Sequence, residues 1–284
     1  MFNGLLVRLL ILVAMSQRPS VAVLGVGAMG EALVSGLLRA GWGAENVSLC
    51  VRRMERGEVL ANQTGCRVHL DPAEAILGRE VVVVAVKPRD VSTVVASIAS
   101  SVQPEQLVIS LAAGVTTDAY ESMIPGSAVI RAMPNTPALV GEGVTGLAGG
   151  AHAGADDLEK ARVVLGAVGD VRIMDEALLD AVTAVSGTGP AYVFLLAEAL
   201  TDAAIREGLP RDIAEMFVNQ TVRGAGRLLT AVDKTPSELR AQVTSPGGTT
   251  AAAVHVLEER GFRALVEDAV RAAAKRAREL GESG

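Results

Sequence analysis

Aromatic residues are scarce in this sequence: its 284 residues include one Trp, two Tyr and four Phe. Half of the residues are nevertheless apolar, so Ala, Val, Leu and Gly must build the interior. Side chains of this kind suit closely packed helices and parallel strands better than a β-sandwich. A chain of this length is expected to fold as one large or two moderate domains.

Other scarcities exclude classes of function. The two cysteines, Cys50 and Cys66, cannot make a disulfide framework or a cysteine-rich zinc site, and we expect no metal. The 26 basic residues are outnumbered by 32 acidic ones, for a net charge of −6, which argues against nucleic-acid binding. Charged residues make up only 20% of the chain, too few for a disordered protein.

An apolar run over residues 2–15 raises the question of a membrane. Arg8 interrupts this run, which is shorter than the roughly 20 residues that a spanning helix needs. A signal peptide would carry its positive charge before the apolar run and not inside it. We interpret Met15 as the translation start and residues 1–17 as a disordered extension, and we expect a cytoplasmic protein without membrane association.

From Ser20 onward, short apolar runs alternate with helical segments. Residues 20–24 are followed by a glycine-rich turn and by a predicted helix over residues 31–40, which Gly41 ends. The continuous apolar run 81–86 is typical of a central parallel strand covered on both faces. Further predicted elements are strands over 47–51, 107–111, 128–132, 144–148 and 171–174, and a helix over 155–168. The pattern predicts a Rossmann-type, doubly wound α/β domain over residues 18–174.

After about Asp175 the strand pattern stops. The predicted helices cover 178–185, 190–206, 211–231, 236–243, 249–259 and 262–280. Proline stands at the first helical position and glycine just past the end in several of them, at Pro190, Pro236, Gly208, Gly261 and Gly281. This half is rich in alanine and too apolar to stand alone in water. We therefore predict an all-helical dimerisation and substrate domain over residues 175–284.

A G-x-G-x-x-G pattern lies between the first strand and the first helix. This is the context that a dinucleotide site requires, with the pyrophosphate at the positive end of the helix. An ordinary glycine turn is the alternative. The residues expected to contact the cofactor are Gly25, Val26, Gly27, Ala28, Met29 and Gly30.

The end of the second strand indicates which dinucleotide is bound. An NAD site usually has an acidic residue there, about 20 positions after the glycines. This chain has Arg52 and Arg53 instead, and guanidinium groups match a 2′-phosphate. The pattern favours NADPH, with NADH as an alternative, unless the two arginines are only solvated loop charges.

Two further strands end in proline-stiffened turns. Val86, Lys87 and Pro88 follow the central strand, where open α/β sheets bind ligands. Asn135 follows the strand over 128–132 in the same way. We predict that these four residues contact the cofactor, while an ordinary exposed lysine is an equal alternative for Lys87.

The helical half has two loops of small residues before predicted helices. Backbone N–H groups at such helix starts can hold an anion such as a carboxylate. Helix capping with flexible glycines is the alternative. The candidate substrate-binding residues are Ser186, Gly187 and Thr188 in the first loop, and Ser245, Gly247, Gly248, Thr249 and Thr250 in the second.

No clear general acid or base accompanies these loops. The three histidines, His69, His152 and His255, are scattered, and no nucleophile–base pair is evident. Reduction of a ketone needs a proton donor, whereas a cyclic imine that arrives protonated accepts hydride directly and needs mainly orientation. A hydroxyl such as that of Thr250 can bond the ring nitrogen.

These blocks together resemble the pyrroline-5-carboxylate reductase family over about residues 18–281. The resemblance rests on the segments 25–30, 85–88, 133–137, 185–192 and 243–250, in the family's order and spacing. It implies NAD(P)H-dependent reduction of 1-pyrroline-5-carboxylate to L-proline, the last step of proline biosynthesis. It also implies a substrate carboxylate on the loop from Ser245 to Thr249, Thr250 as the partner of the ring nitrogen, and an intertwined homodimer that can assemble into rings. Thr188 departs from the serine of many members.

Two other functions are alternatives to this reductase, and each is weakened by a feature of the sequence. A β-hydroxyacid dehydrogenase shares the same plan but needs a lysine in the first helix after the domain junction, and residues 190–207 contain none. A nucleotide-sensing module without catalysis would leave the two anion-type loops unexplained.

Overall fold

The computed structural model describes residues 18–282. The expected disordered extension, residues 1–17, lies outside the described residues. The described residues divide into two compact units, the first comprising residues 18–187 and 274–282 and the second residues 188–273.

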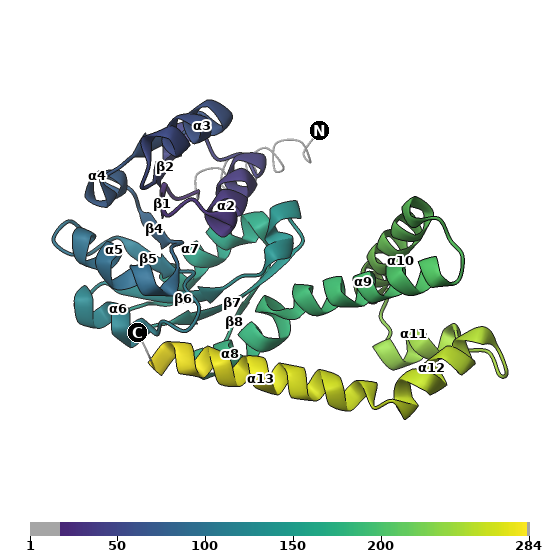
Figure 1. The fold of residues 1–284 in the computed structure, drawn as a ribbon. Coiled ribbons are helices and arrows are strands. Elements are labelled where there is room, and N and C mark those ends of the chain that lie inside the picture. Colours follow the sequence, from purple (N-terminus) through teal and green to yellow (C-terminus); the bar gives the residue numbers. More distant parts are fainter. Residues whose placement is uncertain (1–17, 283–284) are drawn as a thin grey trace, which may run out of the picture. The chain divides into compact units, whose positions relative to one another are not determined.

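The first unit is built on an eight-stranded sheet with the order β3-β2-β1-β4-β5-β6-β7-β8 (Figure 1). All neighbours are parallel except β6 and β7. The carboxyl ends of β1 to β6 therefore lie along one edge. The strands are β1 (Val21–Leu24), β2 (Val47–Cys50), β3 (Arg67–His69), β4 (Val81–Val84), β5 (Leu107–Ser110), β6 (Ala128–Met133), β7 (Gly143–Gly149) and β8 (Gly169–Ile173).

Helices cover both faces of this sheet. The central strands are completely buried and alternate between the faces, so that Val21 and Val23 belong to one core and Ala22 and Leu24 to the other. On the first face lie α2 (Ala28–Arg39), α3 (Met54–Thr64) and α7 (Ala155–Leu165); on the second lie α4 (Pro72–Ile76), α5 (Val91–Ile98) and α6 (Thr117–Met123). The predicted doubly wound α/β class is confirmed.

Several boundaries differ from the prediction. The first helix begins at Ala28 and not at residue 31, because Gly27 is its N-cap and the glycine motif itself enters the helix. The helix predicted over 155–168 ends at Leu165, and Gly166–Val168 form a 3₁₀ turn. β3 and the helices α3 to α6 were not predicted; β3 has only three residues, none fully buried, so it has no readable apolar pattern.

The second unit is helical. Its predicted helices are confirmed to within two residues as α9 (Gly189–Arg206), α10 (Arg211–Ala231), α11 (Pro236–Gln242), α12 (Thr249–Glu259) and α13 (Phe262–Glu282). Gly208 and Gly261 adopt φ of +99° and +75° just after α9 and α12, as expected for helix ends. The expected stop at Gly281 is wrong: this residue lies inside α13, whose last turns belong to the first unit.

The segment between β8 and α9 is also corrected. A helix over 178–185 and then an open loop were expected. Instead, a 3₁₀ turn, η5 (Glu176–Leu178), leads into the short α8 (Leu179–Val182) and a π-helical turn, η6 (Thr183–Gly187). Ser186 and Gly187 are therefore helical, because contacts to β6 and the loop after it override their weak helix propensity. Turns of this π type are frequent at functional sites.

Candidate active site

The glycine motif forms a tight cradle at the carboxyl end of β1. Gly25 has φ of +92°, and a Cβ there would lie 2.6 Å from Val86 Cγ1. A Cβ on Gly30 would lie 2.3 Å from the carbonyl oxygen of Gly25, whereas Gly27 has nothing within 4 Å of its Cβ position. The first and third glycines thus allow close packing, and the second leaves open space for a ligand to approach the backbone.

The start of α2 offers donors to that space. Gly27 is the N-cap and supplies no side-chain hydrogen bond, so the first N–H groups of the helix are left for a ligand. Ala28 is exposed and Met29 half-buried, while Val26 is buried and presents only its backbone. These groups fit the pyrophosphate of a dinucleotide.

The structure brings three of the predicted cofactor segments together. Gly25 packs against Ala85 and Val86 after β4, and its N–H donates to the carbonyl oxygen of Cys50 at the end of β2. Burial raises the pKa of the Cys50 thiol to about 11, so this residue is not ionised near neutral pH. Its carbonyl fixes the turn instead.

The basic residues after β2 and β4 remain available to solvent. Arg52 Nη2 lies 3.7 Å from Asp90 Oδ2, with 85% of the arginine side chain exposed. Arg53 and Lys87 are exposed as well. An exposed pair of this length contributes little to stability, so Arg52 can exchange Asp90 for a phosphate at little cost.

Asn135 lies at the same edge of the sheet, but its amide is engaged within the chain. Its Oδ1 accepts a hydrogen bond from Val144 N at 3.0 Å. Its Nδ2 donates to Ser186 Oγ at 3.1 Å and to Ser186 O at 3.4 Å. The structure thus connects a predicted cofactor residue with a predicted substrate residue.

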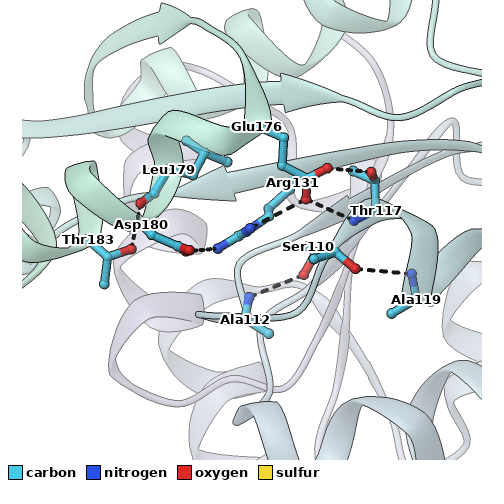
Figure 2. A network of polar contacts seen from close by, with 10 residues as sticks. Ser110, Ala112, Thr117, Ala119, Arg131, Glu176, Leu179, Asp180 and Thr183 are labelled. Atoms are coloured by element: carbon cyan, nitrogen blue, oxygen red, sulfur yellow. Dashed lines mark hydrogen bonds and ion pairs between the residues drawn. The ribbon is translucent and has the colours of Figure 1, made fainter. Parts of the chain in front are cut away.

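A buried ion network, which the sequence did not reveal, connects β6 with the segment that follows β8 (Figure 2). Arg131 of β6, with only 5% of its side chain exposed, lies 2.9 Å from Asp180 Oδ1 and 3.4 Å from Glu176 Oε1. Glu176 also accepts hydrogen bonds from the Thr117 N–H and hydroxyl, at 3.0 and 2.7 Å. A lone arginine inside an apolar strand is the sequence signal that could have indicated such acidic partners.

The remaining predicted substrate residues belong to the second unit. Thr188 precedes α9, and the loop from Ser245 to Gly248 precedes α12. The Gly248 N–H donates to Ser245 O at 3.0 Å, and Gly247 has φ of +69°, as in a turn with proline and then glycine at its centre. Gly248 is an N-cap without a side chain, so the N–H groups at Thr249 and Thr250 face outward from the helix start.

The helical unit exposes many large apolar side chains. In α9, Phe194 and Leu195 are each 66% exposed, and Phe217 of α10 is 59% exposed. The helical stretch Glu176–Arg206 is long and apolar enough to cross a membrane by length and composition, and 11% of its most apolar 18-residue window is buried. An exposed apolar face of this size calls for a covering surface.

No group of three or more potential metal ligands occurs among the described residues. The parallel sheet and the glycine cradle define an oxidoreductase of the dinucleotide-binding class. Residues 176–280 match the family model described as pyrroline-5-carboxylate reductase dimerisation, and residues 20–114 match the model of NADP oxidoreductases dependent on coenzyme F420.

Relatives match over nearly the whole chain. The chain is 44% identical to a pyrroline-5-carboxylate reductase of Mycobacterium tuberculosis, covering 92% of this chain and 96% of the relative. It is 42% identical to that of Synechocystis, covering 92% and 97%. The chain belongs to the pyrroline-5-carboxylate reductase family, and the resemblance expected from the sequence is confirmed.

Solved structures of pyrroline-5-carboxylate reductases are also similar to this chain. The pyrroline-5-carboxylate reductase of Coxiella burnetii is similar with a TM-score of 0.87 and 37% identity, covering 93% of this chain and 98% of that one. The Plasmodium falciparum enzyme, solved with NADP bound, has a TM-score of 0.84 and 29% identity, covering 93% and 99%. The exposed apolar face of the helical unit lies in the part that matches the dimerisation model.

Proposed function

We propose that this chain reduces 1-pyrroline-5-carboxylate to L-proline with NADPH, the last step of proline biosynthesis. The observation that carries this proposal is identity above 40% to named reductases over more than nine-tenths of the chain. The glycine cradle supports it, because a Cβ at Gly25 would collide with Val86 after β4 and one at Gly30 would collide with the Gly25 carbonyl oxygen. A β-hydroxyacid dehydrogenase is not favoured.

The residues at the sheet edge hold the cofactor in this proposal. The N–H groups at the start of α2 bind the pyrophosphate, Arg52 and Arg53 bind the 2′-phosphate, and Val86, Lys87 and Pro88 border the cofactor after β4. When bound, NADPH supplies a hydride from its nicotinamide ring. Arg52 is favoured for the phosphate because its side chain is 85% exposed and only loosely paired.

The substrate is held by its two polar groups. The N–H groups at the start of α12 and the hydroxyls of Ser245 and Thr249 bind the carboxylate, with Ser186, Gly187 and Thr188 as further contacts. Thr250 bonds the ring nitrogen; a hydroxyl can accept from the protonated imine and donate to the amine product. Orientation then provides most of the catalysis, since no proton has to be delivered to a ketone oxygen.

The assembly and location are proposed with the activity. Two copies form a homodimer that covers the apolar helical faces, and dimers can join into rings. We propose a cytoplasmic enzyme that binds neither nucleic acid nor membrane, and the stretch Glu176–Arg206 is then a dimer-covered helix. Light scattering and fractionation of cells test these points.

The decisive experiment follows NADPH oxidation by the full chain with 1-pyrroline-5-carboxylate. The same assay is repeated with NADH and with a 2-keto acid. We expect turnover of the imine, faster with NADPH, and none of the keto acid. Absence of imine turnover by a folded dimer would contradict the proposal, and turnover of the keto acid alone would support the dehydrogenase alternative.

A further inference from the structure

The side-chain amide of Asn135 has a fixed orientation. Only 8% of this residue is exposed, and the backbone N–H of Val144 lies 3.0 Å from one end of its amide. A backbone N–H needs an acceptor, so that end must be the oxygen. The other end, which faces Ser186, is therefore the NH₂ group.

This orientation decides what the Ser186 hydroxyl can do. Asn135 Nδ2 donates to Ser186 Oγ at 3.1 Å and, being an amide nitrogen, cannot accept a proton in return. Ser186 is half-buried, and within residues 18–282 no hydrogen bond uses its own proton. The hydroxyl is thus held as a donor toward a further acceptor.

The segment that carries Ser186 is fastened to β6 at both ends. Arg131 holds Asp180 and Glu176 at its start, and Figure 2 shows these carboxylates converging on the guanidinium. At its other end, a Cβ on Gly187 would lie 2.5 Å from Met133 Cε. The π turn Thr183–Gly187 between these contacts directs Ser186 toward Asn135.

We propose that Asn135 is a positioning residue for the reaction, which fixes the Ser186 hydroxyl as a hydrogen-bond donor to the carboxylate of the bound cyclic imino acid. The inference depends on the proposed function. Of the two polar groups of a protonated imine substrate, the ring nitrogen carries a proton and only the carboxylate can accept one. The sequence analysis predicted that Asn135 contacts the cofactor; in this assignment it acts through Ser186 instead.

The test compares Asn135→Asp and Asn135→Ala with the wild-type full chain. Asn135→Asp keeps the acceptor for Val144 but replaces the donor by an oxygen that takes the Ser186 proton. We expect kcat/KM for 1-pyrroline-5-carboxylate to fall by about tenfold to a hundredfold, the usual effect of losing a hydrogen bond to a charged group. KM for NADPH should stay within about twofold, well inside the change expected from a lost cofactor contact.

A double-mutant cycle tests whether Asn135 acts through Ser186. Ser186→Ala should lose as much kcat/KM as Asn135→Asp, and the double variant should be no worse than Ser186→Ala alone, because both changes remove one interaction. Asn135→Ala gives the same comparison if the aspartate variant does not fold. Ser186→Thr, which keeps the hydroxyl, should retain more activity than Ser186→Ala.

Gln106→Glu is the matched control. Gln106 is 5% exposed and, like Asn135, donates from its amide to backbone carbonyls, those of Ile76 and Arg79. This variant should lower Tm without changing kcat/KM.

The inference is overturned if folded Asn135 variants keep wild-type kcat/KM, if their losses multiply with that of Ser186→Ala, or if KM for NADPH rises instead. Absence of turnover by the wild-type chain would contradict the proposed function as well.

Discussion

Gly114 and Gly281 touch through their backbones. A Cβ on Gly281 would lie 2.6 Å from Gly114 O, and one on Gly114 would lie 3.0 Å from Gly281 N. Gly114 also has φ of +79°, which disfavours any side chain. The last turn of α13 is thereby packed on the loop that follows β5.

Gly281→Ala is expected to destabilise the chain. The added methyl group has to displace the Gly114 backbone, and overpacking of this kind costs about 1–3 kcal/mol. Urea unfolding measures the change. Gly166→Ala is the control, because Gly166 has φ of −61° and open space at its Cβ position, so this change should be neutral or stabilising by up to about 1 kcal/mol. Equal stability of the Gly281 variant and the wild type would contradict the close packing.

The sequence predicted those elements whose local signals agree with their packing. The strand at Val81–Val84 is apolar throughout and buried on both faces, and the helix starting at Gly189 has Pro190 in its first turn. By contrast, Gly281 looks like a helix stop and lies within α13 because Gly114 packs against it. The sequence alone contains no signal for a contact between residues so far apart.

The candidate site also contains features that the sequence predicts and others that it does not. The cradle from Gly25 to Gly30 follows from its spacing, since each glycine has a local geometric task. The partners of Arg131 could not be assigned, because Asp180 and Glu176 are two of 32 acidic residues. The Asn135–Ser186 pair escaped prediction because it depends on a π turn, which tertiary contacts impose.

Removal of one carboxylate from the buried network should destabilise the first unit. Asp180→Asn leaves the Arg131 guanidinium, 5% exposed, with Glu176 as its remaining acid. We expect a loss of about 1.5–3 kcal/mol in the free energy of unfolding, the usual worth of a hydrogen bond to a charged group. Glu159→Gln is the control: its partner Arg162 lowers the pKa of Glu159, but both side chains are more than half exposed, so the loss should stay below about 1 kcal/mol. Similar losses for both variants would argue against the burial of Arg131.

The two cysteines should resist modification in the folded protein. Burial raises the pKa of Cys50 to about 11 and also raises that of Cys66, so few thiolates exist at pH 8, and labelling needs the thiolate. We expect slow reaction with a disulfide reagent at pH 8 and rapid labelling of both thiols in denaturant. The native rate should increase as the pH rises toward 11. Fast native labelling of Cys50 at pH 8 would show that the end of β2 opens readily.

The arginines after β2 should set the cofactor preference. Arg52→Ala and Arg53→Ala remove positive charge from the expected 2′-phosphate position, so kcat/KM for NADPH should fall while that for NADH changes little. Loss of one charge-assisted phosphate contact corresponds to about tenfold to a hundredfold. Arg162→Ala, on α7 and paired with Glu159, is a charge-matched control. An unchanged NADPH/NADH ratio in both variants would remove the arginines from the site.

Substitutions of Thr250 and Thr249 should affect different kinetic constants. Both lie in the first turn of α12 after the Gly248 N-cap, but the proposal gives Thr250 the ring nitrogen and Thr249 the carboxylate. Thr250→Ala should lower kcat by about tenfold or more, because the hydroxyl can donate to the ring nitrogen only as hydride transfer gives that nitrogen a lone pair. Thr250→Ser, which keeps the hydroxyl, should restore most of the rate, whereas Thr249→Ala should mainly raise KM for the imine. Steady-state kinetics with saturating NADPH measure both effects. A Thr250→Ala enzyme with wild-type kcat/KM would assign the ring nitrogen to another residue.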